Sequence, residues 1–245
     1  MNESWGALWI PWTLFLAGAI AVASMSVAKL WARRHERRTN SLITHGLMAI
    51  LSVAAIAGLS QGRFEAFGFT AGTFRWSFLL LLWAIPSAVL TLPQLLARRT
   101  EPLELPFGLT PMQTVVRVWI VASLAEEILM RGLVQSSLGL LSDIGFSVGT
   151  HFVSLPVLAS ALAFSALHLV LFKRMGANAA PVLVATFLLG CVAGVYRETT
   201  GSLIPAVLVH VLFNVGGAVP VWIVGAVRAG RAPQIPRSGG REEGA

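Results

Sequence analysis

The sequence predicts an all-α protein, a polytopic transmembrane helical bundle of about seven spans. Of its 245 residues, 56% are hydrophobic and 12% are charged, whereas soluble domains carry about 25% charged residues. Apolar segments of about 20 residues, the length that crosses a bilayer, recur along the chain. Basic residues gather in the short loops beside them, so the net charge of +7 indicates orientation in a lipid bilayer and not a nucleic-acid partner.

Seven apolar segments are predicted as membrane-spanning helices: 8–30, 41–59, 76–96, 111–141, 151–172, 177–196 and 203–227. The first lacks a basic region before it and would be about 34 Å long as a helix, so we expect a retained span and not a cleaved signal peptide. Three parts follow: N-terminal transmembrane helices 1–3 and their loops at 1–110, a helical core at 111–227, and a disordered basic tail at 228–245.

The loops between these segments predict the orientation. One side receives Arg33, Arg34, Arg37, Arg38, Arg98, Arg99, Lys173, Arg174, Arg228, Arg231, Arg237 and Arg241, and the other side receives Arg63, Arg75 and Arg197. Basic loops stay on the cytoplasmic side of a membrane. The sequence therefore predicts a multi-pass protein of the cell membrane with its N-terminus outside and its C-terminus in the cytoplasm.

The fourth segment contains charges that a membrane helix does not ordinarily carry, at Glu126, Glu127 and Arg131. Each charge near a helix centre costs about 2.5–3.5 kcal/mol, so such groups indicate a functional site. Glu127 and Arg131 are four residues apart and share a helix face, which predicts an ion pair. Glu126 points about 100° away from Glu127 and is left free to act as a general base.

Two later segments add further polar groups. His210 and Asn214 are four residues apart, so both project from one face and offer two hydrogen-bond donors to one point, which suits a developing oxyanion. His168 follows Phe164 by four residues in the fifth segment and could hold the same water molecule as Glu126. His45 and His151 are assigned interfacial or packing roles, with no polar partner expected at helical spacing.

Other interpretations of these residues stay open. The polar side chains could bind helices to one another without any chemistry. Glu126, His168 and His210 form a His/His/Glu set of the kind that binds catalytic zinc, although no His-x-x-x-His pair is present. The single cysteine, Cys191, excludes a Cys-based zinc cluster and an intrachain disulfide.

At these residues the chain resembles the CPBP family of CAAX-type and bacteriocin-processing intramembrane endopeptidases, also called the Abi family. The family pattern is E-E-x-x-x-R, F-x-x-x-H and H-x-x-x-N, in that order on separate membrane helices. Here it takes the form Glu126-Glu127-x-x-x-Arg131, Phe164-x-x-x-His168 and His210-x-x-x-Asn214, preceded at the last motif by the turn Thr200-Gly201-Ser202-Leu203. The resemblance covers residues 111–219.

The resemblance implies a glutamate-dependent peptidase that cleaves membrane-associated peptides or proteins. No cofactor is expected, because the possible zinc ligands lie on separate helices and no cysteine supports them. It assigns water activation to Glu126 with His168, and the oxyanion hole to His210 and Asn214. The supporting residues are Glu127, Arg131 and Phe164. Two alternatives use the same fold differently: a non-catalytic membrane immunity or partner-binding protein, and a small transporter with Glu126 and His168 as a proton relay.

Overall fold

The computed structural model describes residues 3–33, 40–73, 87, 110–149, 151–171 and 179–231. The described residues are mostly helical, as the sequence predicts. The longer helices are α1 (Glu3–Ala32), α2 (Asn40–Ser60), α6 (Leu155–Leu167), α8 (Ala179–Thr200) and α9 (Ile204–Arg231). The shorter helical segments are η2 (Phe64–Phe67), α4 (Pro111–Thr114), η4 (Val115–Ala122), α5 (Ser123–Glu127), η5 (Ile128–Gln135), η6 (Gly139–Leu141) and η7 (His168–Leu171).

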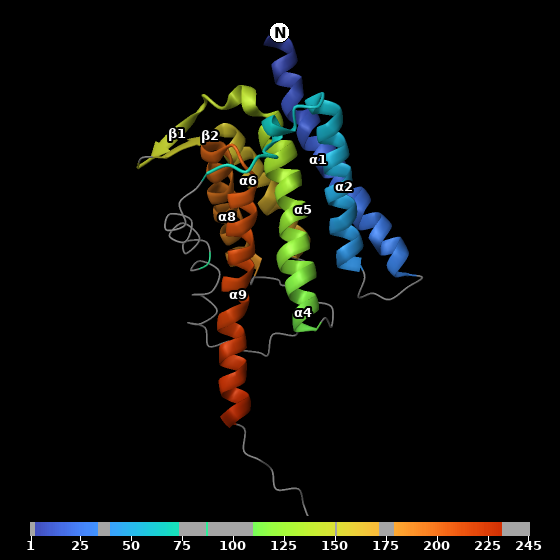
Figure 1. Ribbon diagram of the computed structural model, residues 1–245, viewed down its shortest axis with the longest axis vertical. Coiled ribbons are helices and arrows are strands. Elements are labelled where there is room, and N and C mark those ends of the chain that lie inside the picture. The colour runs from blue at the N-terminus through green and yellow to red at the C-terminus, as the bar shows by residue number, and fades with distance from the viewer. Residues whose placement is uncertain are drawn as a thin grey trace, which may run out of the picture.

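Segments α4, η4, α5 and η5 follow one another without a break and form a central helix over residues 111–135. Figure 1 shows α1 and α2 together on one side of this helix, and α6, α8 and α9 on the other. Helix α2 packs against η4, α5 and η5, whereas α6 and α9 pack against η5 and α5, respectively. The central helix therefore contacts both the N-terminal and the C-terminal helices.

The centre of the bundle is apolar where the central helix meets its neighbours. Leu129 and Leu133 are fully buried, together with Ile56 of α2, Phe164 of α6 and Leu189 of α8. These residues come from four different helices, so burial of their side chains holds the bundle together. The same contacts bring the charged residues of the central helix between α2, α6 and α9.

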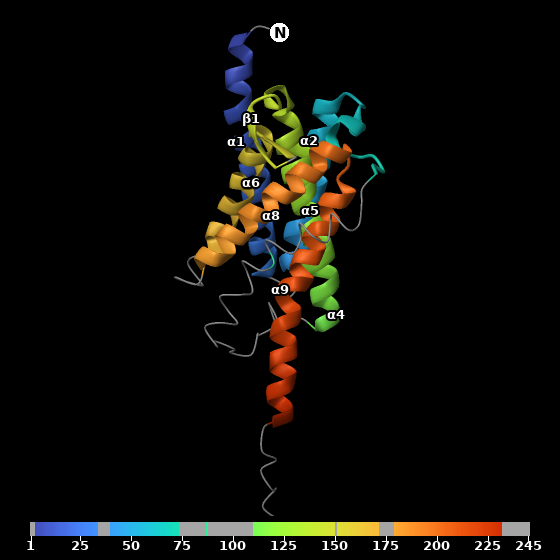
Figure 2. The same cartoon turned by 90° about the vertical axis from the view of Figure 1, so that its left-hand side faces the viewer.

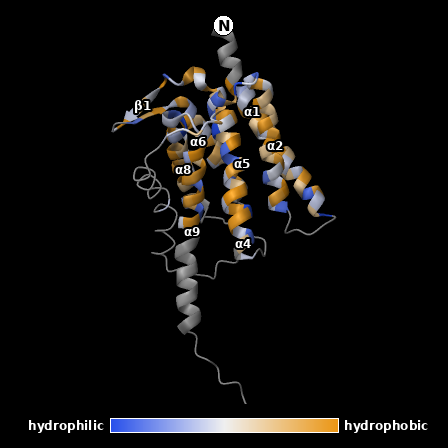
Figure 3. Cartoon of the chain, in the orientation of Figure 1, coloured by the Kyte–Doolittle hydropathy of each residue, from blue (hydrophilic) through white to orange (hydrophobic). Residues whose placement is uncertain are grey.

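Within the described part of the chain, three helical segments are long and apolar enough to cross a membrane: Ile10–Ala32, Asn40–Ser60 and Ala180–Thr200. Two shorter apolar helices cover Leu155–Leu167 and Ile204–Gly217. Hydrophobic residues predominate along these helices (Figure 3), and large ones such as Phe15, Ile50 and Leu162 are exposed, as expected of helices that face lipid. Seven spans remain a prediction, because the predicted span 76–96 lies outside the described residues except for Ser87.

The structure corrects the prediction for the segment around His151. A helix was predicted over 151–172, but β2 (His151–Ser154) pairs antiparallel with β1 (Gly145–Val148), and α6 begins only at Leu155. The hydroxyl of Ser154 accepts a hydrogen bond from the amide of Val157, and a proline occupies the first turn of α6; both features favour a helix start at this point. The hairpin extends sideways from the bundle (Figure 1). It is an exception to the all-α class.

Close contact between α8 and its neighbours depends on two glycines, Gly190 and Gly194. A Cβ at Gly190 would lie 2.8 Å from the Cβ of Ala161 and 3.1 Å from Nη2 of Arg131. A Cβ at Gly194 would lie 2.9 Å from a methyl group of Val157. The small-residue spacing thus lets α6 and the central helix approach α8 closely, and it leaves room for the buried Arg131 side chain.

The turn between α8 and α9 is tied to the loop that follows η2. The Ser202 hydroxyl donates to the carbonyl oxygen of Thr70 at 2.6 Å, and the Leu203 amide donates to the carbonyl oxygen of Gly68 at 2.9 Å. Gly201 has a φ of 69°, which favours glycine. These bonds set where α9 begins. Figure 2 shows α9 running from this turn along the length of the bundle.

Candidate active site

The two adjacent glutamates lie in a five-residue α-helical stretch, α5, between two π-helical segments. Residues 115–122 and 128–135 have the wider π-type turn, so the helix is irregular on both sides of Glu126 and Glu127. Such π-helical departures occur frequently at functional sites. The uniform helical repeat assumed from the sequence therefore holds only for the short α5 segment.

Glu127 is fully buried and has two partners. Its Oε1 accepts a hydrogen bond from Nη1 of Arg131 at 3.2 Å, and Nε of Arg131 lies 3.2 Å from Oε2. The predicted pair of Glu127 with Arg131 is confirmed. The second partner is His210, whose Nδ1 lies 2.8 Å from Oε1. An ionised carboxylate only accepts hydrogen bonds, so Nδ1 of His210 carries a proton.

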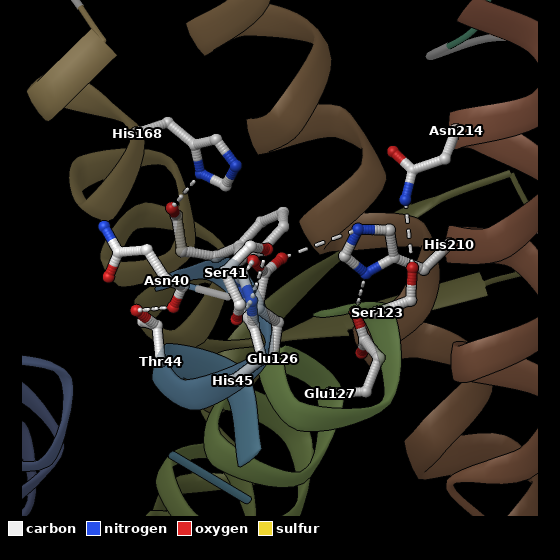
Figure 4. A network of polar contacts seen from close by, with 11 residues as sticks. Asn40, Ser41, Thr44, His45, Ser123, Glu126, Glu127, His168, His210 and Asn214 are labelled. Carbon is white, nitrogen blue, oxygen red and sulfur yellow. Dashed lines mark hydrogen bonds and ion pairs between the residues drawn. The ribbon is translucent and has the colours of Figure 1, made fainter. Parts of the chain in front are cut away.

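Glu126 lies between two imidazole rings and is not fully buried (Figure 4). Its Oε1 is 3.4 Å from Nε2 of His45, and its Oε2 is 3.6 Å from Nε2 of His210. The side chain of Glu126 is 18% exposed, against 0% for Glu127. Glu126 takes no part in the Glu127–Arg131 pair, but α2 and α9 each direct a histidine to its carboxylate, which the spacing along the central helix did not predict.

His45 is a site residue that the sequence analysis missed. It was assigned a packing role without a polar partner, but its Nδ1 lies 2.8 Å from the carbonyl oxygen of Ser41, and its Nε2 faces Glu126. Ser41 stands one helical turn before His45, so this partner was visible in the spacing. The stronger signal was an ionisable residue within an apolar span, which by default indicates function. Its partner Glu126 is 81 positions away along the chain and could not be found from spacing.

The ring of Phe164 contacts two histidines that belong to different helices. Its ring centroid lies 4.8 Å from that of His168 and 5.4 Å from that of His210, both in edge-to-face arrangements. The guanidinium of Arg131 lies over the same ring, 4.8 Å from its centroid, at a distance suited to a cation–π interaction. Phe164 is fully buried, so it acts as a packed centre for these three side chains.

His168 is the first residue of η7, at the end of α6. Its Nδ1 donates to the carbonyl oxygen of Phe164 at 2.9 Å, which directs the lone pair of the neutral ring to Nε2. His168 lies within electrostatic range of the Glu126 carboxylate. Figure 4 shows His168 in the same region of the bundle as Glu126.

His210 and Asn214 both reach from α9 to the central helix, but to different partners. Nδ2 of Asn214 donates to the Ser123 hydroxyl at 3.0 Å, whereas His210 contacts the two glutamates. Ser123 is therefore a further residue of the site that the motifs did not include. In this arrangement the two donors are held by side chains of α5 and do not converge on one point.

Among the described residues, no group of three His, Cys, Asp or Glu side chains has the arrangement needed to hold a metal ion.

The fold and the site together define a membrane protein whose helices enclose a carboxylate and imidazole centre. Residues 108–216 match the family model of the Rce1-like type II CAAX prenyl endopeptidases. These CAAX endopeptidases are part of the CPBP family, so the match confirms the resemblance stated from the motifs. The match points to a CAAX-type protease. No curated protein and no solved structure matches the chain.

Proposed function

We propose that this protein is an intramembrane endopeptidase that hydrolyses peptide bonds of membrane-associated proteins or peptides, with Glu126 as the general base. The observation that carries the proposal is the difference between two adjacent carboxylates. Glu127 is fully buried and held by Arg131 and His210 at 2.8–3.2 Å. Glu126 is partly exposed and has only the longer contacts of 3.4 and 3.6 Å. A general base must be able to reach water, and Glu126 meets that requirement better.

In the proposed reaction, Glu126 takes a proton from a water molecule that His168 helps to hold through Nε2. The resulting hydroxide attacks the carbonyl carbon of the scissile peptide bond and forms a tetrahedral intermediate. Glu126 then returns the proton to the leaving nitrogen as the C–N bond breaks, so it is regenerated as a carboxylate. No other group has to enter this cycle.

The negative oxygen of the intermediate would be stabilised by His210 and Asn214. Because Nδ1 of His210 is committed to Glu127, His210 can donate from Nε2 only as an imidazolium. The buried Glu127 carboxylate would stabilise the positive charge of His210. Glu127 would thus have a second role besides its pairing with Arg131. Asn214 would exchange its Ser123 partner for the oxyanion. Both groups would then donate hydrogen bonds to the oxygen on which negative charge develops, which lowers the barrier to the reaction.

The substrate would enter from the membrane or from its surface, because the site is enclosed by apolar helices. We place the protein in the cell membrane with its N-terminus outside and its C-terminus in the cytoplasm, on the strength of the basic loops. The C-terminal tail beyond Arg231 would then lie in the cytoplasm.

The test is cleavage of a membrane-anchored peptide library by the purified protein in liposomes. Glu126→Gln should remove most turnover while the protein still folds, because the amide cannot accept the water proton. Glu65→Gln is the matched control, since it makes the same change at an exposed carboxylate in η2. Wild-type cleavage by the Glu126→Gln variant would disprove the assignment. Absence of cleavage by the wild type would favour an immunity or partner-binding role, and proton flux coupled to solute uptake would favour the transporter.

The same assay tests the expectation that no metal is required. The wild-type protein should keep its activity in the presence of a chelator. If activity disappears with chelator and returns with added zinc, the water is activated by a metal ion and not by the carboxylate alone.

A further inference from the structure

We propose that His45 is a positioning residue for Glu126, which it holds through a hydrogen bond from Nε2 to the carboxylate. The inference rests on the function proposed above. His45 belongs to α2, which precedes the segment 108–216 that matches the family. The site would then be completed by a helix that the family pattern does not include.

The orientation of the His45 ring is set by its own helix. Nδ1 lies 2.8 Å from the carbonyl oxygen of Ser41, and the Ser41 hydroxyl is 3.3 Å from the same nitrogen. A carbonyl oxygen only accepts hydrogen bonds, so Nδ1 carries the proton. This bond directs Nε2 toward α5, where it lies 3.4 Å from Oε1 of Glu126.

The positions of the protons follow from these contacts. A neutral His45 with its proton on Nδ1 has a lone pair on Nε2, and this lone pair would face the lone pairs of the Glu126 carboxylate. One further proton between Nε2 and Oε1 removes that repulsion. With the proton on Nε2, Glu126 remains a carboxylate anchored at Oε1. Its Oε2 then lies on the side of His210, 3.6 Å from Nε2 of that ring.

The charged surroundings of this contact come from three other segments. His210 of α9 and His168 of η7 lie near the Glu126 carboxylate, and the Glu127–Arg131 pair follows it along the central helix. Within this group, Glu127 already neutralises Arg131 and bonds to His210. Nε2 of His45 lies 3.4 Å from Glu126, and Nε2 of His210 lies 3.6 Å from it.

A packing role alone does not account for a histidine at this position. The buried residues of α2 are Met48, Ser52, Ile56 and Ser60, which form a stripe at helical spacing along the face toward the central helix. His45 continues the stripe by one turn, at the level where that face reaches Glu126. For packing alone, an apolar residue would be expected at this position. A histidine is present instead, and it faces the carboxylate of Glu126.

The first test asks whether His45 acts through its N–H donor or through the bulk of its ring. His45→Phe keeps a ring of similar size but has no donor, so kcat should fall about tenfold to a hundredfold, the scale of a slightly misplaced catalytic group, while KM changes little. His45→Gln places an amide N–H near the position of Nε2 and should restore most of kcat. His45→Asn is too short to do so and should resemble the Phe variant. Thr44→Val is the control, because it removes a neighbouring hydroxyl that donates to the backbone carbonyl oxygen of Asn40.

A purely structural role predicts a different result. Stability would fall, turnover per folded molecule would stay near that of the wild type in all three His45 variants, and Gln would show no advantage over Asn. That pattern overturns the inference. If the Phe variant does not fold, the comparison of Gln with Asn, which differ by one methylene, still decides the question.

A second measurement does not depend on peptidase activity. Nitrogen-15 NMR of histidine-labelled full-length protein in lipid nanodiscs, at neutral pH, reports which ring nitrogens carry protons. We expect His45 to be protonated at Nε2 in the wild type and to lose that proton in Glu126→Gln. A His45 signal that is unaffected by Glu126→Gln refutes the contact. If the NMR result is as expected but the wild type cleaves nothing, the proposed peptidase function has failed and the His45–Glu126 contact has not.

Discussion

The buried pair of Glu127 and Arg131 should dominate the stability of the central helix. Both side chains are fully buried, with an Nη1–Oε1 distance of 3.2 Å. Replacing Arg131 by Met keeps a long apolar side chain beside Phe164 but leaves the Glu127 carboxylate buried without its cation. The substitution therefore removes the positive charge of Arg131 and keeps most of the packing around it.

The expected magnitude follows from the distance and the burial. At an effective dielectric constant of about 20, two unit charges 3.2 Å apart attract by about 5 kcal/mol. Breaking a buried ion pair by removing one partner typically costs about 3–5 kcal/mol. Loss of the cation–π contact with Phe164 adds about 1 kcal/mol. We therefore expect Arg131→Met to lower the free energy of unfolding by about 4–6 kcal/mol.

The assay is the free energy of unfolding in bicelles, measured by steric trapping. The double variant Glu127→Gln with Arg131→Met should recover at least half of the loss, because it removes the unpaired charge and keeps an acceptor for Nδ1 of His210. A loss below about 1 kcal/mol for the single variant would refute the reasoning. A double variant that is less stable than the single one would refute it as well, since the two changes would then act as independent packing defects.

Two further predictions concern the oxyanion donor and the orientation. Asn214→Ala should lower turnover about 10²–10³-fold with little change in KM and a loss of stability of about 0.6 kcal/mol, the average interhelical hydrogen bond in a membrane. Ser123→Ala breaks the same hydrogen bond but keeps the Asn214 amide, so turnover of this variant should stay near that of the wild type. Near-normal turnover per folded molecule of Asn214→Ala would contradict the oxyanion role. With Cys191 replaced by Ala, a cysteine at Arg63 should react with an impermeant reagent only from outside, and one at Arg231 only from the cytoplasm. Labelling of position 63 from the cytoplasm would disprove the predicted orientation.

Most of the helices could be predicted from the sequence because long apolar runs have few structural alternatives in a membrane protein. The predicted segments 8–30, 41–59, 177–196 and 203–227 each lie almost entirely within an observed helix. The fourth, 111–141, ends earlier, at Gln135, and the fifth was wrong over His151–Ser154. Phe152 and Val153 are compatible with a strand as well as with a helix, so composition could not separate the two. The pairing partner Gly145–Val148 decided it.

The sequence by itself determined the membrane character of the chain, the family resemblance of residues 111–219, and the pairing of Glu127 with Arg131. Each of these depends on composition or on short spacing along one helix, where geometry is set by the helical repeat. The tertiary structure decided which groups surround Glu126. His45 and His210 reach that carboxylate from α2 and α9, positions 81 and 84 residues away along the chain. Such contacts depend on how separate helices pack, and no local pattern encodes that packing.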